Sequence, residues 1–152
     1  MKSPGRDFLH HHGTLALLYG LLCVLVALLV IPTWGWTYWD FGDGNYMYIA
    51  RRVSEGLVLY RDILAPQPPL HTLAGVVAEA AGNALFDSRL IGVRLYSLLV
   101  RLLGGLFVLL IARRFFGCPF RAITAAAVYL FMPIGFWWSL GYQSENLEIV
   151  FL

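Results

Sequence analysis

Long apolar runs separated by shorter polar stretches dominate the hydrophobic pattern of the chain. The three longest runs cover residues 15–31, 90–112 and 122–138. At a helical rise of ~1.5 Å per residue, the second run reaches about 34 Å, which exceeds the ~30 Å hydrocarbon core of a bilayer. The pattern predicts three transmembrane helices over these residues, and the apolar segment from Leu147 predicts the start of a fourth.

A polar, basic start followed by an apolar run is also the pattern of a secretory signal peptide. Here the run is longer than an ordinary signal core, and Pro-Thr-Trp-Gly-Trp follows it in place of a small-residue cleavage site. The aromatic residues at positions 34–39 resemble the belt found at a membrane–water interface. We therefore predict an uncleaved first span with the N-terminus, which carries Lys2 and Arg6, on the cytoplasmic side.

The loop between the first two spans, residues 32–89, contains the most polar stretch of the chain. Over residues 43–56, apolar positions recur at helical spacing on one face, while Arg51, Arg52 and Glu55 lie on the other. This pattern predicts a short amphipathic helix on the membrane surface, with Asp43 at its N-cap and Gly56 at its end.

Residues 70–86 fit either a further span or a second interfacial helix, because they are only moderately apolar and include His71, Glu79 and Asn83. If this segment crossed the membrane, the basic loop after residue 112 would lie outside. That loop contains Arg113, Arg114 and Arg121. Because cytoplasmic loops are enriched in Lys and Arg, we predict that residues 70–86 lie on the outer face without crossing.

The composition agrees with lipid as the solvent for much of the chain. Hydrophobic residues make up 59% of the 152 residues and charged residues only 13%, against the ~25% usual in soluble domains. The net charge of +2 is too small to indicate nucleic-acid binding. Cys23 and Cys118 define neither a disulfide framework nor a metal site, and Gly104 with Gly105 indicates close helix packing.

The first loop also has a particular order of short motifs. It reads Asp40-Phe41-Gly42-Asp43-Gly44-Asn45-Tyr46, then Ala50-Arg51, Gly56, Tyr60-Arg61-Asp62 and Pro66-Gln67-Pro68-Pro69. In order and spacing this resembles the first external loop of the GT-C membrane glycosyltransferases, especially the group of protein O-mannosyltransferases and lipid A aminoarabinose transferases (glycosyltransferase family 39-like). The resemblance implies an all-α, polytopic transmembrane helix bundle with interfacial helices in this loop, of which these 152 residues form an N-terminal part. It also implies transfer of a sugar from a polyprenyl-phosphate-linked donor to an acceptor at the outer membrane face.

In that family, one carboxylate of a loop Asp-Glu pair is thought to act as base on the acceptor, and Asp43 is the matching position. Gly42 stands where the first acid of the pair often stands, so Asp40 is a second candidate. Glu145 is a third, because related enzymes have an acid at about this point after the third span. Inverting transfer needs one general base to take the acceptor proton, while the phosphate leaves with little help. Helix capping by Asp43, or divalent metal binding by a loop carboxylate, is the alternative, and no other cofactor is implied.

Arg94 and Arg101 lie seven residues apart on one face of the second span, and both are candidates for binding the donor phosphate. Arg101 lies about halfway along that span, where an uncompensated charge costs at least ~2.5 kcal/mol, and a guanidinium matches phosphate oxygens. The alternatives are an ion pair with another helix, or extension of Arg94 towards the surface. Polar loop residues are candidates for a substrate cavity, although the Arg-Asp pair also fits a structural turn: Tyr46, Arg61, Asp62, Gln67 and His71.

Together these features predict a multi-pass protein of the cell membrane. Its expected partners are a lipid-linked sugar donor, an unidentified acceptor and membrane lipid, and not nucleic acid. Two other classes stay open. A transporter would use the midspan arginines for an anionic substrate, and Pro133 is the one sign of the broken helices that transporters use. A non-catalytic membrane scaffold would need none of Asp43, Arg101 and Glu145.

Overall fold

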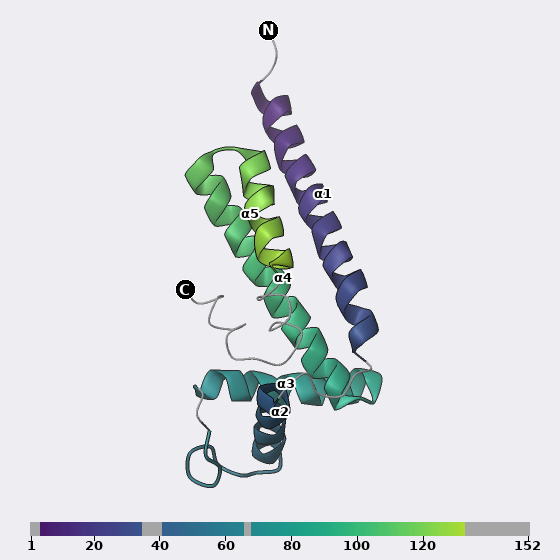
Figure 1. Ribbon diagram of the computed structural model, residues 1–152, viewed down its shortest axis with the longest axis vertical. Coiled ribbons are helices and arrows are strands. Elements are labelled where there is room, and N and C mark those ends of the chain that lie inside the picture. The colour runs from purple at the N-terminus through teal and green to yellow at the C-terminus, as the bar shows by residue number, and fades with distance from the viewer. Residues whose placement is uncertain (1–3, 35–40, 66–67, 133–152) are drawn as a thin grey trace.

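The computed structural model describes residues 4–34, 41–65 and 68–132, and these residues are largely helical (Figure 1). The elements are α1 (Pro4–Val30), the 3₁₀ turn η1 (Ile31–Thr33), α2 (Phe41–Ser54), α3 (Pro69–Phe86), α4 (Arg89–Phe116) and α5 (Pro119–Phe131). The described ranges contain no β-strand, and Leu59 and Ile63 form an isolated bridge. The predicted all-α class is confirmed.

Proline, serine and glycine account for several helix ends. Pro69 and Pro119 lie in the first turns of α3 and α5, where a missing backbone N–H has no intrahelical partner to lose. Helix α4 begins after Ser88, whose hydroxyl accepts a hydrogen bond from the Ile91 amide at 3.4 Å. It ends at Gly117, whose φ of 62° is a left-handed conformation that glycine adopts without steric cost.

Among the described residues, two helices are long and apolar enough to cross a membrane, over Gly13–Thr33 and Arg89–Phe116, and they coincide with the first two predicted spans. Leucines along α1 stay exposed, with Leu17 at 65%, as expected for a helix surrounded by lipid and not for the core helix of a soluble protein. These helices support a membrane location for the chain. Helix α5 is only ~20 Å long over Pro119–Phe131, which is too short to cross a bilayer. The remainder of the predicted span 122–138 and the segment from Leu147 lie outside the described residues.

Helices α1, α4 and α5 pack together with alternating direction. The N-terminal half of α1 meets the C-terminal half of α4, where Leu15 joins Leu109 and Ala122 in one apolar cluster. The C-terminal half of α1 meets the N-terminal half of α4, where Val26 packs with Leu98. As a result, the start of α1 and the turn between α4 and α5 lie at the same end of the molecule (Figure 1). This is the arrangement predicted for the arginine-rich loop, and its side of the membrane stays a prediction.

Close approach of α4 and α5 depends on Gly104 and Gly105, as predicted from the sequence. A Cβ atom added to Gly105 would lie 2.8 Å from Cδ2 of Leu130 and 2.9 Å from the hydroxyl of Tyr19. A Cβ on Gly104 would meet the ring of Tyr129. The same region is tied to α1 by the Tyr19 hydroxyl, which donates a hydrogen bond to the Leu102 carbonyl. Small residues therefore let three helices meet at one level.

Helix α3 runs across the end of α4 instead of alongside it (Figure 1). The crossing is made by Gly82 and Gly92, since a Cβ on Gly82 would lie 2.5 Å from the Cα of Gly92. A tight turn joins the two helices, with Asp87 at φ 51° capping α3. Helix α2 packs on α3, and Met47, Ala78 and Val93 form a small core where the three helices meet.

Candidate functional site

The proposed catalytic carboxylates lie at or near the start of α2. Helix α2 begins at Phe41, so Asp43 lies within its first turn and not at the N-cap position predicted from the sequence. The apolar periodicity starts only after Gly44, and for that reason it placed the helix start two residues too late. An acidic residue in the first turn is still favoured by the positive end of the helix dipole. The other two candidate acids, Asp40 and Glu145, lie outside the described residues.

Tyr46 and His71, both predicted to line a substrate cavity, are brought into contact by the packing of α2 on α3. Their rings meet edge to face, with centroids 5.1 Å apart and planes at 89°. His71 is only 2% exposed, and burial lowers its pKa from 6.5 to about 4 because the imidazolium would lose its hydration. His71 is therefore a neutral ring at physiological pH. Gln67, the neighbouring candidate, lies outside the described residues.

Arg61 and Asp62 form part of an exposed turn. Two guanidinium nitrogens of Arg61, Nε and Nη2, each donate to the Asp62 carboxylate at 2.9 Å, and the same carboxylate accepts from the Val58 amide at 2.9 Å. The Arg61 guanidinium and the Val58 N–H hold the pKa of Asp62 below its usual range. These contacts agree with the predicted structural turn, and a role of this pair towards a substrate stays a prediction.

Arg101 is buried in the middle of α4 and contacts the end of α5. Its Nη2 donates to the Leu130 carbonyl and lies 3.4 Å from the Tyr129 carbonyl, and its guanidinium carbon lies 5.9 Å from the centre of the Tyr129 ring. The Tyr129 carbonyl would ordinarily accept from the amide of residue 133, but that residue is proline and has no N–H. A carbonyl group without a hydrogen-bond donor is energetically costly at a helix end inside a membrane. The Arg101 guanidinium supplies a donor to carbonyls at the end of α5 and so reduces that cost.

Arg94 lies seven residues before Arg101, on the same face of α4, and is 1% exposed. It belongs with Val93 and Ser97 to the most deeply buried side chains among the described residues. At this depth the side chain is not open to a phosphate from solvent. The geometry therefore does not bring the two predicted phosphate ligands together at an open surface, and their donor-binding role stays a prediction.

A buried acid that the sequence analysis did not select lies between α2, α3 and the start of α4. Glu79 is 4% exposed, and its Oε2 is 3.8 Å from Nη1 of Arg89, within ion-pair range but too far for a hydrogen bond. Burial raises the pKa of Glu79, and the charges of Arg89 and Arg51 oppose that rise. The signal available in the sequence was an acid inside an apolar helix, beside the small residues Gly75, Ala78 and Gly82 that mark a packed face.

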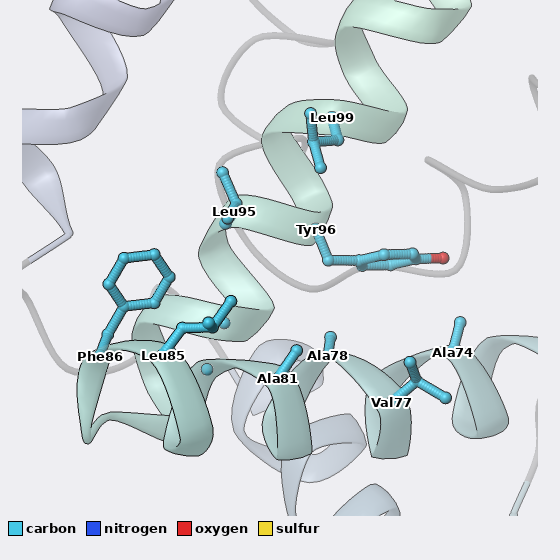
Figure 2. A pocket seen from close by; sticks show the side chains of 11 residues that line it. Ala74, Val77, Ala78, Ala81, Leu85, Phe86, Leu95, Tyr96 and Leu99 are labelled. Atoms are coloured by element: carbon cyan, nitrogen blue, oxygen red, sulfur yellow. The ribbon is translucent and has the colours of Figure 1, made fainter.

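An apolar groove of about 370 Å³ lies on another side of α3, in the angle between α3 and α4 (Figure 2). Ala74, Val77 and Ala81 form its floor on α3, while Leu95 and Leu99 of α4 form its wall. The ring of Tyr96 extends over α3 and its hydroxyl lies at the edge of the groove in this view. The lining is suited to hydrocarbon and offers little polar chemistry.

The part of the chain that the structure describes holds no cluster of three or more His, Cys, Asp or Glu side chains able to share a metal ion. Of the two carboxylates considered for metal binding near the start of α2, Asp43 belongs to the described residues and Asp40 does not.

Comparison with known proteins assigns no family: no protein-family model matches the chain, and no curated protein or solved structure is significantly similar to it.

Proposed function

We propose that the chain forms part of a membrane glycosyltransferase that moves a sugar from a polyprenyl-phosphate-linked donor to an acceptor at the outer membrane face. The observation that supports this most is the position of α2. This helix has Asp43 in its first turn, packs on the crosswise helix α3, and meets the beginning of the apolar helix α4. In the proposed enzyme, the carboxylate on this helix acts at the level where a lipid-linked phosphate and a water-soluble acceptor meet.

The chemistry assigned to Asp43 is that of a general base. Its carboxylate takes the proton of the attacking acceptor hydroxyl, the hydroxyl oxygen bonds to the anomeric carbon, and the polyprenyl phosphate leaves with the bonding electrons. The first turn of a helix favours the ionised carboxylate, which is the form that accepts a proton. Residues Ala50 and Arg51 on the same helix, and Arg61 and Asp62 after it, continue the motif order on which the proposal also depends.

The described contacts give less support to the two other classes. A transporter would need the midspan arginine for its substrate, whereas Arg101 is occupied by the carbonyls of α5. A passive scaffold would not need a buried acid such as Glu79 between two arginines.

The test is turnover of a polyprenyl-phosphate sugar by the protein that carries this chain, with the Asp43→Asn and Asp40→Asn variants. Asparagine keeps the size of the side chain but accepts no proton at neutral pH, so loss of the base is expected to reduce the rate by about 10²- to 10⁴-fold. Asp87→Asn is the matched control, because it makes the same chemical change in the exposed turn between α3 and α4, at a residue with no proposed role in sugar transfer. Collapse in the Asp40 variant alone moves the base to Asp40. Near-normal turnover in both variants rejects a base at this helix and leaves Glu145 as the next position to test.

A further inference from the structure

The cleft around Glu79 combines a buried carboxylate, two guanidinium groups and open volume. Two cavities, of about 250 and 280 Å³, share Glu79 and Arg89 as a common wall. Together they fall within the ~300–1,000 Å³ range of small-molecule sites. The midspan arginines Arg94 and Arg101 are not among the described residues that line them.

The two cavities differ in chemistry. One is bordered by Arg51 and Arg89, together with Tyr48. The other is bordered by Ser54, whose hydroxyl donates to the Arg51 carbonyl and can still accept, and by Asn83. Guanidinium groups recognise phosphate oxygens, whereas hydroxyl, amide and carboxylate groups together recognise sugar or polyol hydroxyls. A ligand that fills both cavities therefore carries a phosphate at one end and hydroxyl groups at the other.

Glu79 lines both cavities, and its carboxylate has hydrogen-bonding capacity left. Its Oε2 is buried and accepts no hydrogen bond from the described residues, since Arg89 stays at 3.8 Å. A buried ionised oxygen without a donor is destabilising, so a ligand hydroxyl at this position gains a charge-assisted hydrogen bond. This oxygen is the feature that separates the cleft from an ordinary surface ion pair.

The charges nearby select an anion over a metal cation. Arg51 and Arg52 both pair with Glu55, at 3.2 and 2.5 Å, and Arg89 faces Glu79. Three arginines and two glutamates leave one net positive charge around the cleft. The side chains of Arg51 and Arg89 remain 60% and 47% exposed, so a ligand phosphate reaches both without any change in packing.

We propose that Glu79, Arg51 and Arg89 bind the phosphate-linked polyol headgroup of a membrane lipid, with the guanidinium groups on the phosphate and the carboxylate on a polyol hydroxyl. The cleft lies where α2 and α3 meet the beginning of the apolar helix α4, which is the level of lipid headgroups if α4 spans the bilayer. Two sources supply this chemistry. One is the sugar–phosphate group of a polyprenyl-phosphate donor, which rests on the function proposed above, and the other is an anionic glycerophospholipid of the bilayer.

The experiment measures binding of short-chain lipids to the purified chain in a neutral detergent by isothermal titration calorimetry. The probes are dihexanoyl phosphatidylglycerol, which has an anionic phosphate and a polyol, dihexanoyl phosphatidylethanol, which has the same anionic phosphate without a hydroxyl group, and a short-chain polyprenyl-phosphate hexose. The wild-type chain is expected to prefer phosphatidylglycerol to phosphatidylethanol. Arg89→Gln should weaken binding of all phosphate probes by about tenfold or more, because charged hydrogen bonds are lost. Glu79→Gln should instead reduce the preference for the polyol by about fivefold, because a neutral acceptor replaces a charged one.

Two further variants keep the test decisive. Arg51→Gln changes a largely exposed side chain, so it tests the phosphate side even if Glu79→Gln unfolds, which far-UV circular dichroism reports. Arg114→Gln is the matched control, because it removes the same charge from an exposed arginine at the other end of α4. Equal affinity of the wild type for phosphatidylglycerol and phosphatidylethanol overturns the proposal. So does wild-type binding by folded Glu79→Gln and Arg51→Gln, or an equal loss in Arg114→Gln.

The probes also separate this site from the proposed transferase activity. If only the polyprenyl-phosphate hexose binds in a Glu79-dependent way, the cleft is a donor site, and if phosphatidylglycerol binds as well, it is a general headgroup site. If headgroup binding depends on Glu79 but no sugar is transferred, the headgroup site is supported and the proposed transferase function is rejected. If sugar transfer depends on Asp43 but headgroup binding is unaffected by Glu79→Gln, only the headgroup site is rejected.

Discussion

Replacing Gly92 with alanine is expected to force α3 and α4 apart at their crossing. The new Cβ would overlap the Ala78 carbonyl oxygen and would lie 2.6 Å from the Cα of Gly82 and 2.7 Å from its nitrogen. All three obstacles are backbone atoms of α3, so no side-chain rotation relieves the overlap. Real Cβ atoms stay more than 3.0 Å from such neighbours, and one helix therefore has to shift as a unit.

The magnitude follows from two opposing effects. Alanine gains about 1 kcal/mol over glycine in helix propensity, while overpacking a close-packed contact costs about 1–3 kcal/mol. Because the overlap is with backbone on the facing helix, we take the upper end of the cost and expect a net loss of about 2 kcal/mol in the free energy of unfolding. The shift would also disturb the small core of Met47, Ala78 and Val93 beside the crossing.

The assay is equilibrium unfolding in mixed micelles with increasing SDS, followed by far-UV circular dichroism. Gly20→Ala is the matched control, since a Cβ there meets nothing within 4 Å and the variant should be neutral or more stable by up to about 1 kcal/mol. Gly104→Ala should fall between the two, because its obstacle is the movable side chain of Tyr129. An unfolding free energy of Gly92→Ala within about 0.5 kcal/mol of wild type would show that the helices do not cross as closely as described.

Three further predictions concern His71, Arg101 and Cys118. Acidification from pH 6.5 to below 4 should lower the free energy of unfolding by roughly 3 kcal/mol through His71 alone. The reason is that the histidine gains a proton near pH 6.5 in the unfolded chain but only near pH 4 when it is buried. The His71→Phe variant should therefore show a flatter dependence of unfolding free energy on pH over that window. Arg101→Met should raise amide hydrogen exchange over the last turn of α5 by about tenfold, since its carbonyls lose a charged donor, whereas unchanged exchange would remove the capping role assigned to Arg101. Backbone N–H groups of Arg121 and Phe120 lower the pKa of the Cys118 thiol, so it should react readily with an impermeant maleimide, but only after the cell membrane is opened; labelling in intact cells contradicts the predicted topology.

Local patterns in the sequence were sufficient to place the helices. Apolar runs located α1 and α4, and amphipathic spacing located α2, because both signals depend only on residues within one element. The predicted spans ended at residue 112 and began again at residue 122, whereas α4 extends to Phe116 and α5 begins at Pro119, because Gly117 and Pro119 set these ends through their backbone preferences and not through hydrophobicity. The start of α2 was misplaced because residues 41–44 carry no apolar periodicity, although they are helical.

The interpretation of the charged residues was less complete. A sequence can show that a charged residue lies within an apolar helix, but it does not show which groups on other helices compensate the charge. Arg101 was recognised as a costly midspan charge, but its acceptors lie 28 and 29 residues away on α5. The position of these carbonyls depends on the end of α5 at Phe131 and on the packing of α5 against Gly104 and Gly105. No pattern within α4 contains that information.

What the sequence determined by itself was therefore the number, position and apolar character of the described helices, together with the close packing at Gly104 and Gly105. Only the tertiary structure decided that α3 crosses α4 at Gly82 and Gly92, and with that crossing the surroundings of His71 and Glu79. The physical reason is that helix formation is governed by residues three and four apart. Burial, pKa and the choice of ionic partner depend instead on contacts between elements that are distant in the chain.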